Sequence, residues 1–230
     1  MKYMIHACPP RMWYVDNFLL PSMQAQGIAR EDVTVWNDKA GAGNLKSFVQ
    51  SMKLCGVLND RGVWHLQDDV ILSSSFAERT AKLEQTRAEP VICGFGCNFG
   101  DGTVDFKGKT PVKFLWYSFP CVFISNMLAW EFAEWFEQVA ATSPGFREKL
   151  DSGKMDDCFF RSFMLARHQN DHVFHATPAL VDHVDYLIGG SQVNRLRTRK
   201  INRAQYWEEP ELVEKLIERL EKYKQRNPFL

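Results

Sequence analysis

The chain has 230 residues, of which 45% are hydrophobic and 24% are charged, and this is enough apolar material for the core of one α/β domain. Lysine plus arginine and aspartate plus glutamate both number 28, so the formal net charge is zero. A general nucleic-acid-binding protein usually has a basic excess. The charge balance therefore disfavours that class, although a neutral total can hide a local basic patch.

The six cysteines lie mostly in apolar stretches and form no CxxC pair, which is typical of reduced, buried thiols in a cytosolic protein. Cys93, Cys97 and His175 could be imagined as zinc ligands, but their spacing does not match common zinc motifs. The segment before Pro9-Pro10 is too short for the apolar core of a signal peptide, and polar residues break the most hydrophobic stretch, 114–130. We therefore expect a cytoplasmic protein without membrane insertion.

Strands and helices are expected to alternate through residues 1–85. The expected strands are Lys2–Ala7, Val33–Trp36 and Val63–Leu72. The expected helices are 11–26, which Pro21 should kink or divide, 44–54, which Asn44 could cap, and a third that starts after Ser73–Ser75. This alternation predicts a mostly parallel sheet with right-handed crossovers.

The second half is less regular. Strands are expected at Val91–Gly96, Phe114–Ser125 and 172–178, and helices at 126–141, 155–168 and, with a charged amphipathic pattern, Pro210–Lys224. We expect one α/β domain over residues 1–205, with halves 1–85 and 86–205, followed by a helical appendage over 206–230. The sheet should be mixed but mostly parallel and flanked by helices.

Two adjacent acids, Asp68 and Asp69, interrupt the strand-like run VWHLQDDVIL. Carboxylates at the edge of a core are costly unless a cation compensates them. Ligands of open α/β sheets bind beyond the carboxyl ends of the strands. Adjacent acids there can hold a hard divalent cation, which also bridges phosphate oxygens. A turn, or a cap on the next helix, is the alternative interpretation.

The run Gln67-Asp68-Asp69-Val70, with Ser73 and Phe76 downstream, resembles the acidic motif of GT-A type glycosyltransferases, which often reads E-D-D-V-x-x-S-x-x-F. Gln67 departs from the commoner acid at the first position. The resemblance covers most of the chain, up to about Ser191, and implies a GT-A (Rossmann-like) fold.

The same resemblance implies transfer of a sugar from a nucleoside-diphosphate sugar, in the first place a UDP-sugar, to an acceptor hydroxyl. It implies that Asp69 binds Mn²⁺ or Mg²⁺ and that Asp68 contacts the donor sugar or ribose. The acceptor is left open between a small molecule, a protein and a modified nucleic-acid base.

The segment Pro178–Ser191 resembles the late segment of such enzymes, in which a strand and a loop bring a histidine to the metal. By this resemblance a neutral His183 completes an oxygen and nitrogen ligand set with Asp69. The flanking acids Asp182 and Asp185 and the following glycines favour this role, and a purely structural histidine is the alternative.

The acids Asp156 and Asp157 stand at the expected start of a helix. They could simply cap that helix and interact with its dipole. In inverting GT-A enzymes an acid at the start of a comparable helix is the general base that deprotonates the acceptor hydroxyl. The resemblance assigns this role to Asp157 before Asp156.

In GT-A folds the ends of the first two strands line the nucleotide pocket. The resemblance thus implies contacts to the donor from a set of residues that follow the first three strands: His6, Ala7, Pro9, Asn37, Asp38 and Gln67. Gly43 and Asn44 lead into a helix N-terminus, which is a natural anion site. For Asn37 and Asp38 an Asx turn is an equal alternative.

Two further segments have weaker indications. Trp116-Tyr117 and Phe95-Gly96 could offer aromatic faces to an acceptor or could pack in the core. The basic run 195–203 could steer an anion or could be a solvated segment.

Two other functions compete with the glycosyltransferase interpretation. A nucleotidyltransferase would be expected to have a glycine-rich, basic loop directly after its first strand, where this chain has Cys8-Pro9-Pro10-Arg11. A non-catalytic nucleotide-binding module would keep the fold and need no metal.

Overall fold

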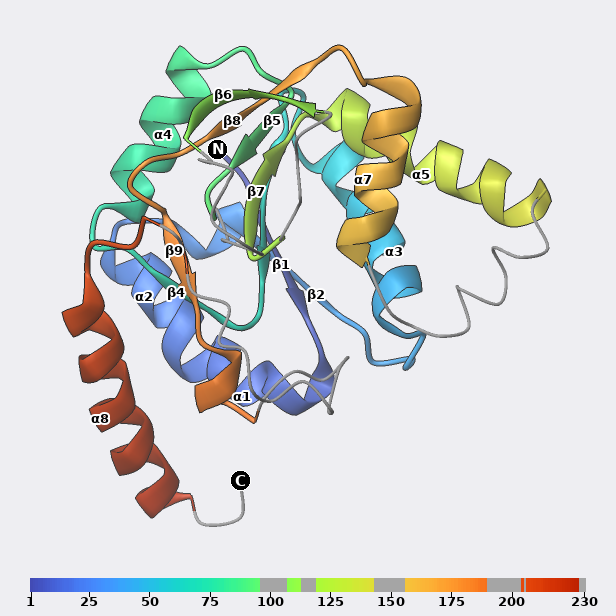
Figure 1. Cartoon of the computed structure of the whole chain (residues 1–230). Helices are drawn as coiled ribbons and strands as arrows, with labels where there is room; N and C mark the ends of the chain where they lie inside the picture. The colour runs from blue at the N-terminus through green and yellow to red at the C-terminus, as the bar shows by residue number, and fades with distance from the viewer. Residues whose placement is uncertain (96–106, 113–118, 143–155, 190–203, 205, 228–230) are drawn as a thin grey trace.

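The computed structural model describes residues 1–95, 107–112, 119–142, 156–189, 204 and 206–227. Within these residues seven strands form one sheet in the order β2-β1-β3-β7-β5-β8-β6, and two further strands, β4 and β9, pair separately. Helices cover both faces of the large sheet: α1, α2 and α4 lie on one side, and α3, α5 and α7 lie on the other (Figure 1). The protein is therefore an α/β fold of Rossmann-like layering, as the sequence predicts.

Five described strands of the large sheet run in one direction, and β6 and β7 run in the opposite direction. The bounds are Tyr3–Ala7 (β1), Val33–Asn37 (β2), Val63–Gln67 (β3), Val91–Cys93 (β5), Gly108–Pro111 (β6), Cys121–Ile124 (β7) and His172–His175 (β8). The sheet is thus mixed and mostly parallel, which confirms the prediction. Every residue of β1 is buried, as befits a central parallel strand covered on both faces.

The helical segment that follows β1 is divided, as expected from Pro21. A 3₁₀ turn, Pro9–Arg11, leads into α1, Met12–Tyr14, then into a π-helical turn, Val15–Leu19, and finally into α2, Leu20–Ala25. Pro21 lies in the first turn of α2, directly after the π-helical turn Val15–Leu19.

The remaining helices are α3 (Asn44–Leu58), α4 (Phe76–Thr86), α5 (Asn126–Thr142), α7 (Asp156–Arg167) and α8 (Pro210–Arg226). Short 3₁₀ turns lie at Arg30–Asp32 and Asp185–Leu187. The expectation that Asn44 caps α3 is wrong, because Gly43 occupies the N-cap position and Asn44 is the first helical residue. Gly43 has a positive φ of 87°, a conformation that glycine adopts without strain.

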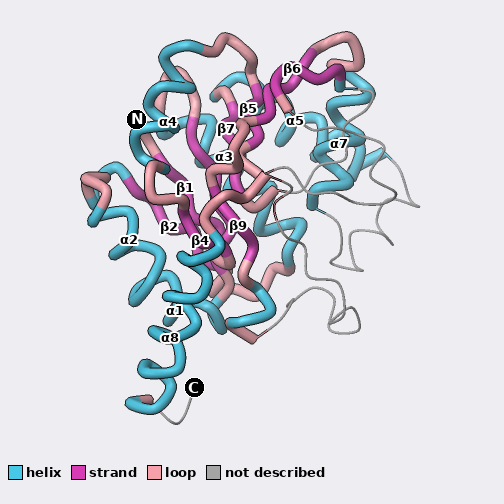
Figure 2. The backbone as a smooth tube through the Cα atoms, turned by 60° about the vertical axis from the view of Figure 1, so that its left-hand side comes forward, coloured by secondary structure: helices cyan, strands magenta, loops and turns pink. Residues whose placement is uncertain are grey.

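One of the strands expected from the sequence is two separate strands in the structure. The run Val63–Leu72 divides into β3, which ends at Gln67, and β4, Val70–Leu72, which leaves the large sheet. The prediction of a single strand is therefore wrong, because Asp68 and Asp69 form a turn between the two. β4 instead pairs antiparallel with β9, Val181–His183 (Figure 2).

The amphipathic helix α8 packs against the same hydrophobic core as α1 and α2 (Figure 2). Its apolar side chains Val213, Leu216 and Leu220 are buried. Tyr223 stacks on Trp13 of α1, with ring centroids 5.6 Å apart. Among the described helices none combines the length and the apolar character that crossing a membrane requires.

Candidate functional site

The acidic pair lies at the carboxyl-end edge of the large sheet. β1 lies between β2 and β3, so the strand order extends to one side of β1 with β2 and to the other side with β3. In open α/β sheets ligands bind in the crevice outside the carboxyl ends at such a switch point. Asp68 and Asp69 follow directly after Gln67, the last residue of β3, and β3 is the parallel neighbour of β1.

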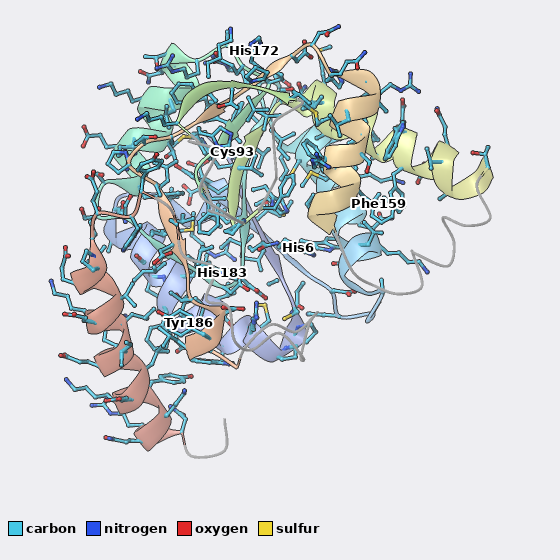
Figure 3. The ribbon with its side chains drawn as sticks, viewed as in Figure 1. His6, Cys93, Phe159, His172, His183 and Tyr186 are labelled. Atoms are coloured by element: carbon cyan, nitrogen blue, oxygen red, sulfur yellow. The ribbon has the colours of Figure 1, made fainter. Side chains whose placement is uncertain are left out.

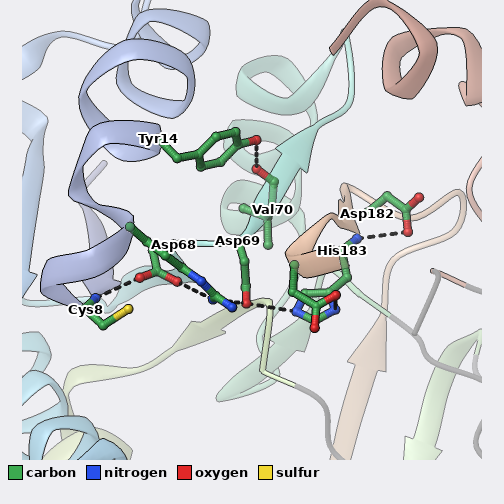
Figure 4. Close-up of polar contacts among 9 residues, drawn as sticks. Cys8, Tyr14, Asp68, Asp69, Val70, Asp182 and His183 are labelled. Atoms are coloured by element: carbon green, nitrogen blue, oxygen red, sulfur yellow. Dashed lines mark hydrogen bonds and ion pairs between the residues drawn. The ribbon is translucent and has the colours of Figure 1, made fainter. Parts of the chain in front are cut away.

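Asp68 and Asp69 are both buried and share one cation, the guanidinium of Arg11. Arg11 Nη1 donates to Asp68 Oδ1 at 2.9 Å and also to Asp69 Oδ2. The backbone N–H of Cys8 donates to Asp68 Oδ2 at 2.7 Å (Figure 4). The arginine compensates the charge that makes a buried acidic pair costly, and both oxygens of Asp68 accept hydrogen bonds from the protein.

His183 reaches the acidic pair through the small sheet β4–β9. Val70 and His183 are register partners, and the N–H of Val184 donates to the backbone oxygen of Asp69 at 2.8 Å. This pairing leaves His183 Nε2 at 3.1 Å from Asp69 Oδ2 (Figure 4). The structure thus brings together the two residues that the sequence singles out as metal ligands.

Two acids fix the loop around His183. The carboxylate of Asp182 accepts hydrogen bonds from the N–H groups of His183, at 2.9 Å, and of Ala204, at 2.8 Å. Asp185 Oδ1 lies 3.5 Å from His183 Nδ1, at ion-pair distance. Metal-ligating histidines commonly have a carboxylate beside the second ring nitrogen, which orients the ring.

The charges of the site shift the pKa values of its members. Burial alone would raise the pKa of Asp69, but the neighbouring His183 and Arg11 outweigh burial and lower it. Burial and the adjacent charge of Asp69 raise the pKa of Asp68 despite Arg11. Burial would lower the pKa of His183, and Asp69 and Asp185 raise it instead. A metal ion binds only the neutral imidazole, so the raised pKa of His183 opposes metal binding.

Asp69 and His183 could hold a divalent cation only together with further ligands, such as the oxygens of a phosphate. Among the described residues no group of three or more histidine, cysteine, aspartate or glutamate side chains is arranged to hold a metal ion. However, Mg²⁺ in phosphate-binding sites commonly takes only one or two carboxylates from the protein.

Two details of Asp69 agree with this kind of site. Its Oδ1 is buried and has no hydrogen-bond partner among the described residues. The 3.1 Å between its Oδ2 and His183 Nε2 is a hydrogen-bonding distance, and it is also close to the separation of about 3 Å between neighbouring ligands that each lie about 2.1 Å from one ion. Asp69 and His183 are therefore the residues that could hold the metal.

The ends of β1 and β2 lie side by side. Ala7 and Asn37 are register partners, and the N–H of Asp38 donates to the oxygen of Ala7 at 3.2 Å. The carboxylate of Asp38 accepts from the N–H groups of Ala42, at 2.9 Å, and Gly43, at 3.1 Å, so it shapes the loop before α3. Asn37 Oδ1 is buried and has no hydrogen-bond partner within the described part of the chain. Asn37 is thus the better placed of the two polar residues to contact a ligand.

Four other residues expected at the nucleotide differ in exposure. His6 is buried on the α3 side of the sheet, with Nε2 at 2.8 Å from Ser47 Oγ (Figure 3). Ala7 is buried at the end of β1, and Pro9 is exposed. Gln67 is half-buried, and its N–H donates to the oxygen of Pro120 at 3.0 Å.

Asp156 and Asp157 are the first residues of α7, and their side chains lie outside the described part of the structure. Because α7 leads directly into β8, which runs parallel to β5, the N-terminal end of α7 faces the carboxyl-end edge of the sheet. The side chain of Asn44, residues Gly96, Trp116 and Tyr117, and the basic run 195–203 also lie outside the described residues.

Sequence reasoning does not place Arg11 in the site. The sequence does contain an indication of this role. Arg11 directly follows Pro9-Pro10 after the first strand, and the carboxyl ends of neighbouring parallel strands meet at one edge of the sheet. What the sequence lacks is the information that β1 and β3 are neighbours.

Comparison with models of protein families found no match. A search of curated proteins likewise found no significant match.

Proposed function

We propose that the protein is a metal-dependent glycosyltransferase of the GT-A type. It transfers a sugar from a nucleoside-diphosphate sugar, in the first place a UDP-sugar, to an acceptor hydroxyl. The observation that carries the proposal is the meeting of Asp69 and His183 at the carboxyl-end edge of the sheet, 3.1 Å apart, beside a second buried acid. Mn²⁺ or Mg²⁺ held there would stabilise the charge that develops on the leaving diphosphate.

The residues around the acidic pair have separate roles in this proposal. Asp69 and His183 bind the cation. Asp68, whose carboxylate accepts hydrogen bonds from Cys8 and Arg11, is proposed to contact the donor sugar or ribose. If the enzyme inverts, Asp157 at the start of α7 accepts the proton of the attacking hydroxyl. The acceptor is a small molecule, a protein or a modified nucleic-acid base.

The test is calorimetry with UDP and MnCl₂ on the wild type and on Asp69→Asn. We expect the wild type to bind UDP only when Mn²⁺ is present and the variant to bind at least about tenfold more weakly, because a neutral amide is a poor ligand for a hard cation. Asp171→Asn is the matched control, since this acid pairs with His168, away from the acidic pair.

Absence of metal-dependent UDP binding in the wild type would overturn the proposal. Metal-independent binding that Asp69→Asn leaves unchanged would instead indicate a non-catalytic nucleotide-binding module. A screen of nucleotide-sugar donors by mass spectrometry then identifies the transferred sugar.

A further inference from the structure

Arg11 occupies the position at which a bound cation would be expected. It lies at the end of the turn Pro9–Arg11, directly after β1, and is only 5% exposed. Its Nη1 contacts one oxygen of Asp68 and one of Asp69. The Asp69 oxygen that it contacts, Oδ2, is also the one nearest His183.

A divalent cation and Arg11 cannot both bind Asp69 Oδ2 without strong repulsion. Like charges a few ångströms apart repel strongly in a buried site, where water screens them little. A metal ion that binds alone between Asp69 Oδ2 and His183 must therefore displace the guanidinium from Asp69. The displaced guanidinium would lose part of its compensation in a site that excludes water.

A diphosphate changes this balance. Phosphate oxygens are good acceptors for the guanidinium fork, which binds them through parallel hydrogen bonds. When metal and diphosphate arrive together, Arg11 has a new anionic partner beside the one it leaves. The cost of displacing it is then offset.

We propose that Arg11 is a positioning residue that acts as the internal counter-cation of Asp68 and Asp69. It holds the acidic pair when no ligand is bound, weakens the binding of a divalent cation alone, and moves from Asp69 to the diphosphate when cation and diphosphate bind together. Metal and diphosphate therefore bind cooperatively. The diphosphate step rests on the proposed function, whereas the competition between Arg11 and the metal at Asp69 does not.

The test measures binding of Mn²⁺ alone, and of inorganic pyrophosphate at saturating Mn²⁺, by calorimetry on Arg11→Met and Lys53→Met. Met keeps the apolar stem of the arginine and removes its charge. For Arg11→Met we expect the Kd for Mn²⁺ alone to fall at least about tenfold, because a competing cation is gone, and the Kd for pyrophosphate to rise at least about tenfold.

Lys53→Met is the matched control. Lys53 of α3 pairs with Glu137 of α5 in another part of the molecule. Its replacement therefore removes one positive charge, as Arg11→Met does, but away from the acidic pair. Both Kd values should stay within about twofold of the wild type, because exposed ion pairs contribute little. An unchanged or weaker affinity of Arg11→Met for Mn²⁺ alone overturns the proposal, since a merely structural role would lower the affinity for both ligands.

A second variant keeps the test decisive if Arg11→Met does not fold. The double variant Arg11→Met/Asp68→Asn buries one uncompensated acid fewer than Arg11→Met does. Its reference is the single variant Asp68→Asn. Mn²⁺ should raise the melting temperature of the double variant more than that of Asp68→Asn, because ligands that bind only the folded state stabilise it by mass action. An equal or smaller rise overturns the proposal.

The outcomes also separate this inference from the proposed function. If the wild type binds no UDP but Arg11→Met binds Mn²⁺ more tightly, the counter-cation role is supported and the glycosyltransferase proposal is rejected. If the wild type binds UDP only with metal but Arg11→Met gains no affinity for Mn²⁺, the glycosyltransferase proposal is supported and the counter-cation role is rejected.

Discussion

His183 is the residue that most directly joins the two halves of the candidate site, because its imidazole lies 3.1 Å from Asp69 and comes from a distant strand. We predict that His183→Asn raises the Kd for Mn²⁺ at saturating UDP at least about tenfold, the lower end of what loss of a metal-site residue costs. Titration calorimetry measures this.

His168→Asn is the control for His183→Asn. Its imidazole also pairs with carboxylates, Asp171 at 2.8 Å and Glu131 at 3.1 Å, but away from the acidic pair. The control should bind Mn²⁺ and UDP like the wild type. Equal affinity in both variants would mean that His183 is a structural partner of Asp69 and not a ligand.

The sequence reveals Asp68 and Asp69 because two acids in an apolar run break the local pattern. The local indications at His183, its flanking acids and the glycines that follow, are weaker, and only the resemblance links it to Asp69. Arg11 escapes prediction because its role depends on two strands being neighbours, β1 and β3, and pairing of strands is not a local property of the chain.

At the scale of elements, the alternation of strands and helices is predictable, and the break between β3 and β4 is not. Apolar residues continue on both sides of Asp68 and Asp69, so the run has the period of one long strand. The partner of β4 is β9, which is more than a hundred residues away in the chain, and this long-range pairing decides where β3 ends.

The helix α8 offers a test of packing within one element. Leu216 is buried against the core that contains α1 and α2, whereas its neighbour Ile217 is exposed. We predict that Leu216→Ala lowers the free energy of unfolding by about 2–4 kcal/mol, because it removes buried methyl groups and leaves a cavity. Urea denaturation measures this difference.

Ile217→Ala is the matched control on the same helix. It should change the free energy of unfolding by no more than about 0.5 kcal/mol, as is usual for exposed positions. Similar losses in both variants would show that the two side chains are buried alike in solution, for example by a second copy of the chain.

For the whole molecule, composition and alternation predict the α/β class and a mostly parallel sheet, and both are present. The position of β7, antiparallel between β3 and β5, could not be predicted. β7 is four buried residues, Cys121–Ile124, whose apolar run fits a parallel or an antiparallel neighbour equally well. Strand order is settled by packing of the complete sheet.

Three described histidines, His6, His65 and His175, are buried with lowered pKa values, and the first two are neighbours. His6 and His65 lie on β1 and β3 with ring centroids 5.8 Å apart, and they contact Ser47 and Ser51 of α3. Burial lowers the pKa of His6 to about 4, against a weaker opposite effect of Asp38 and Asp69. Burial and the neighbouring His6 hold the pKa of His65 well below its ordinary value.

Between about pH 6.5 and pH 4 the unfolded chain binds more protons at these histidines than the folded protein does, so stability falls as the pH is lowered. From pH 7 to pH 5 we expect His6 to cost about 2 kcal/mol, and His65 adds a cost of the same sign. Urea unfolding of the wild type and of His6→Gln/His65→Gln at both pH values measures this. The double variant should lose at least about 2 kcal/mol less than the wild type, whatever its stability at pH 7. His183, whose pKa is raised, acts in the opposite direction but equally in both proteins. Equal losses would mean that His6 and His65 are not buried as neutral groups.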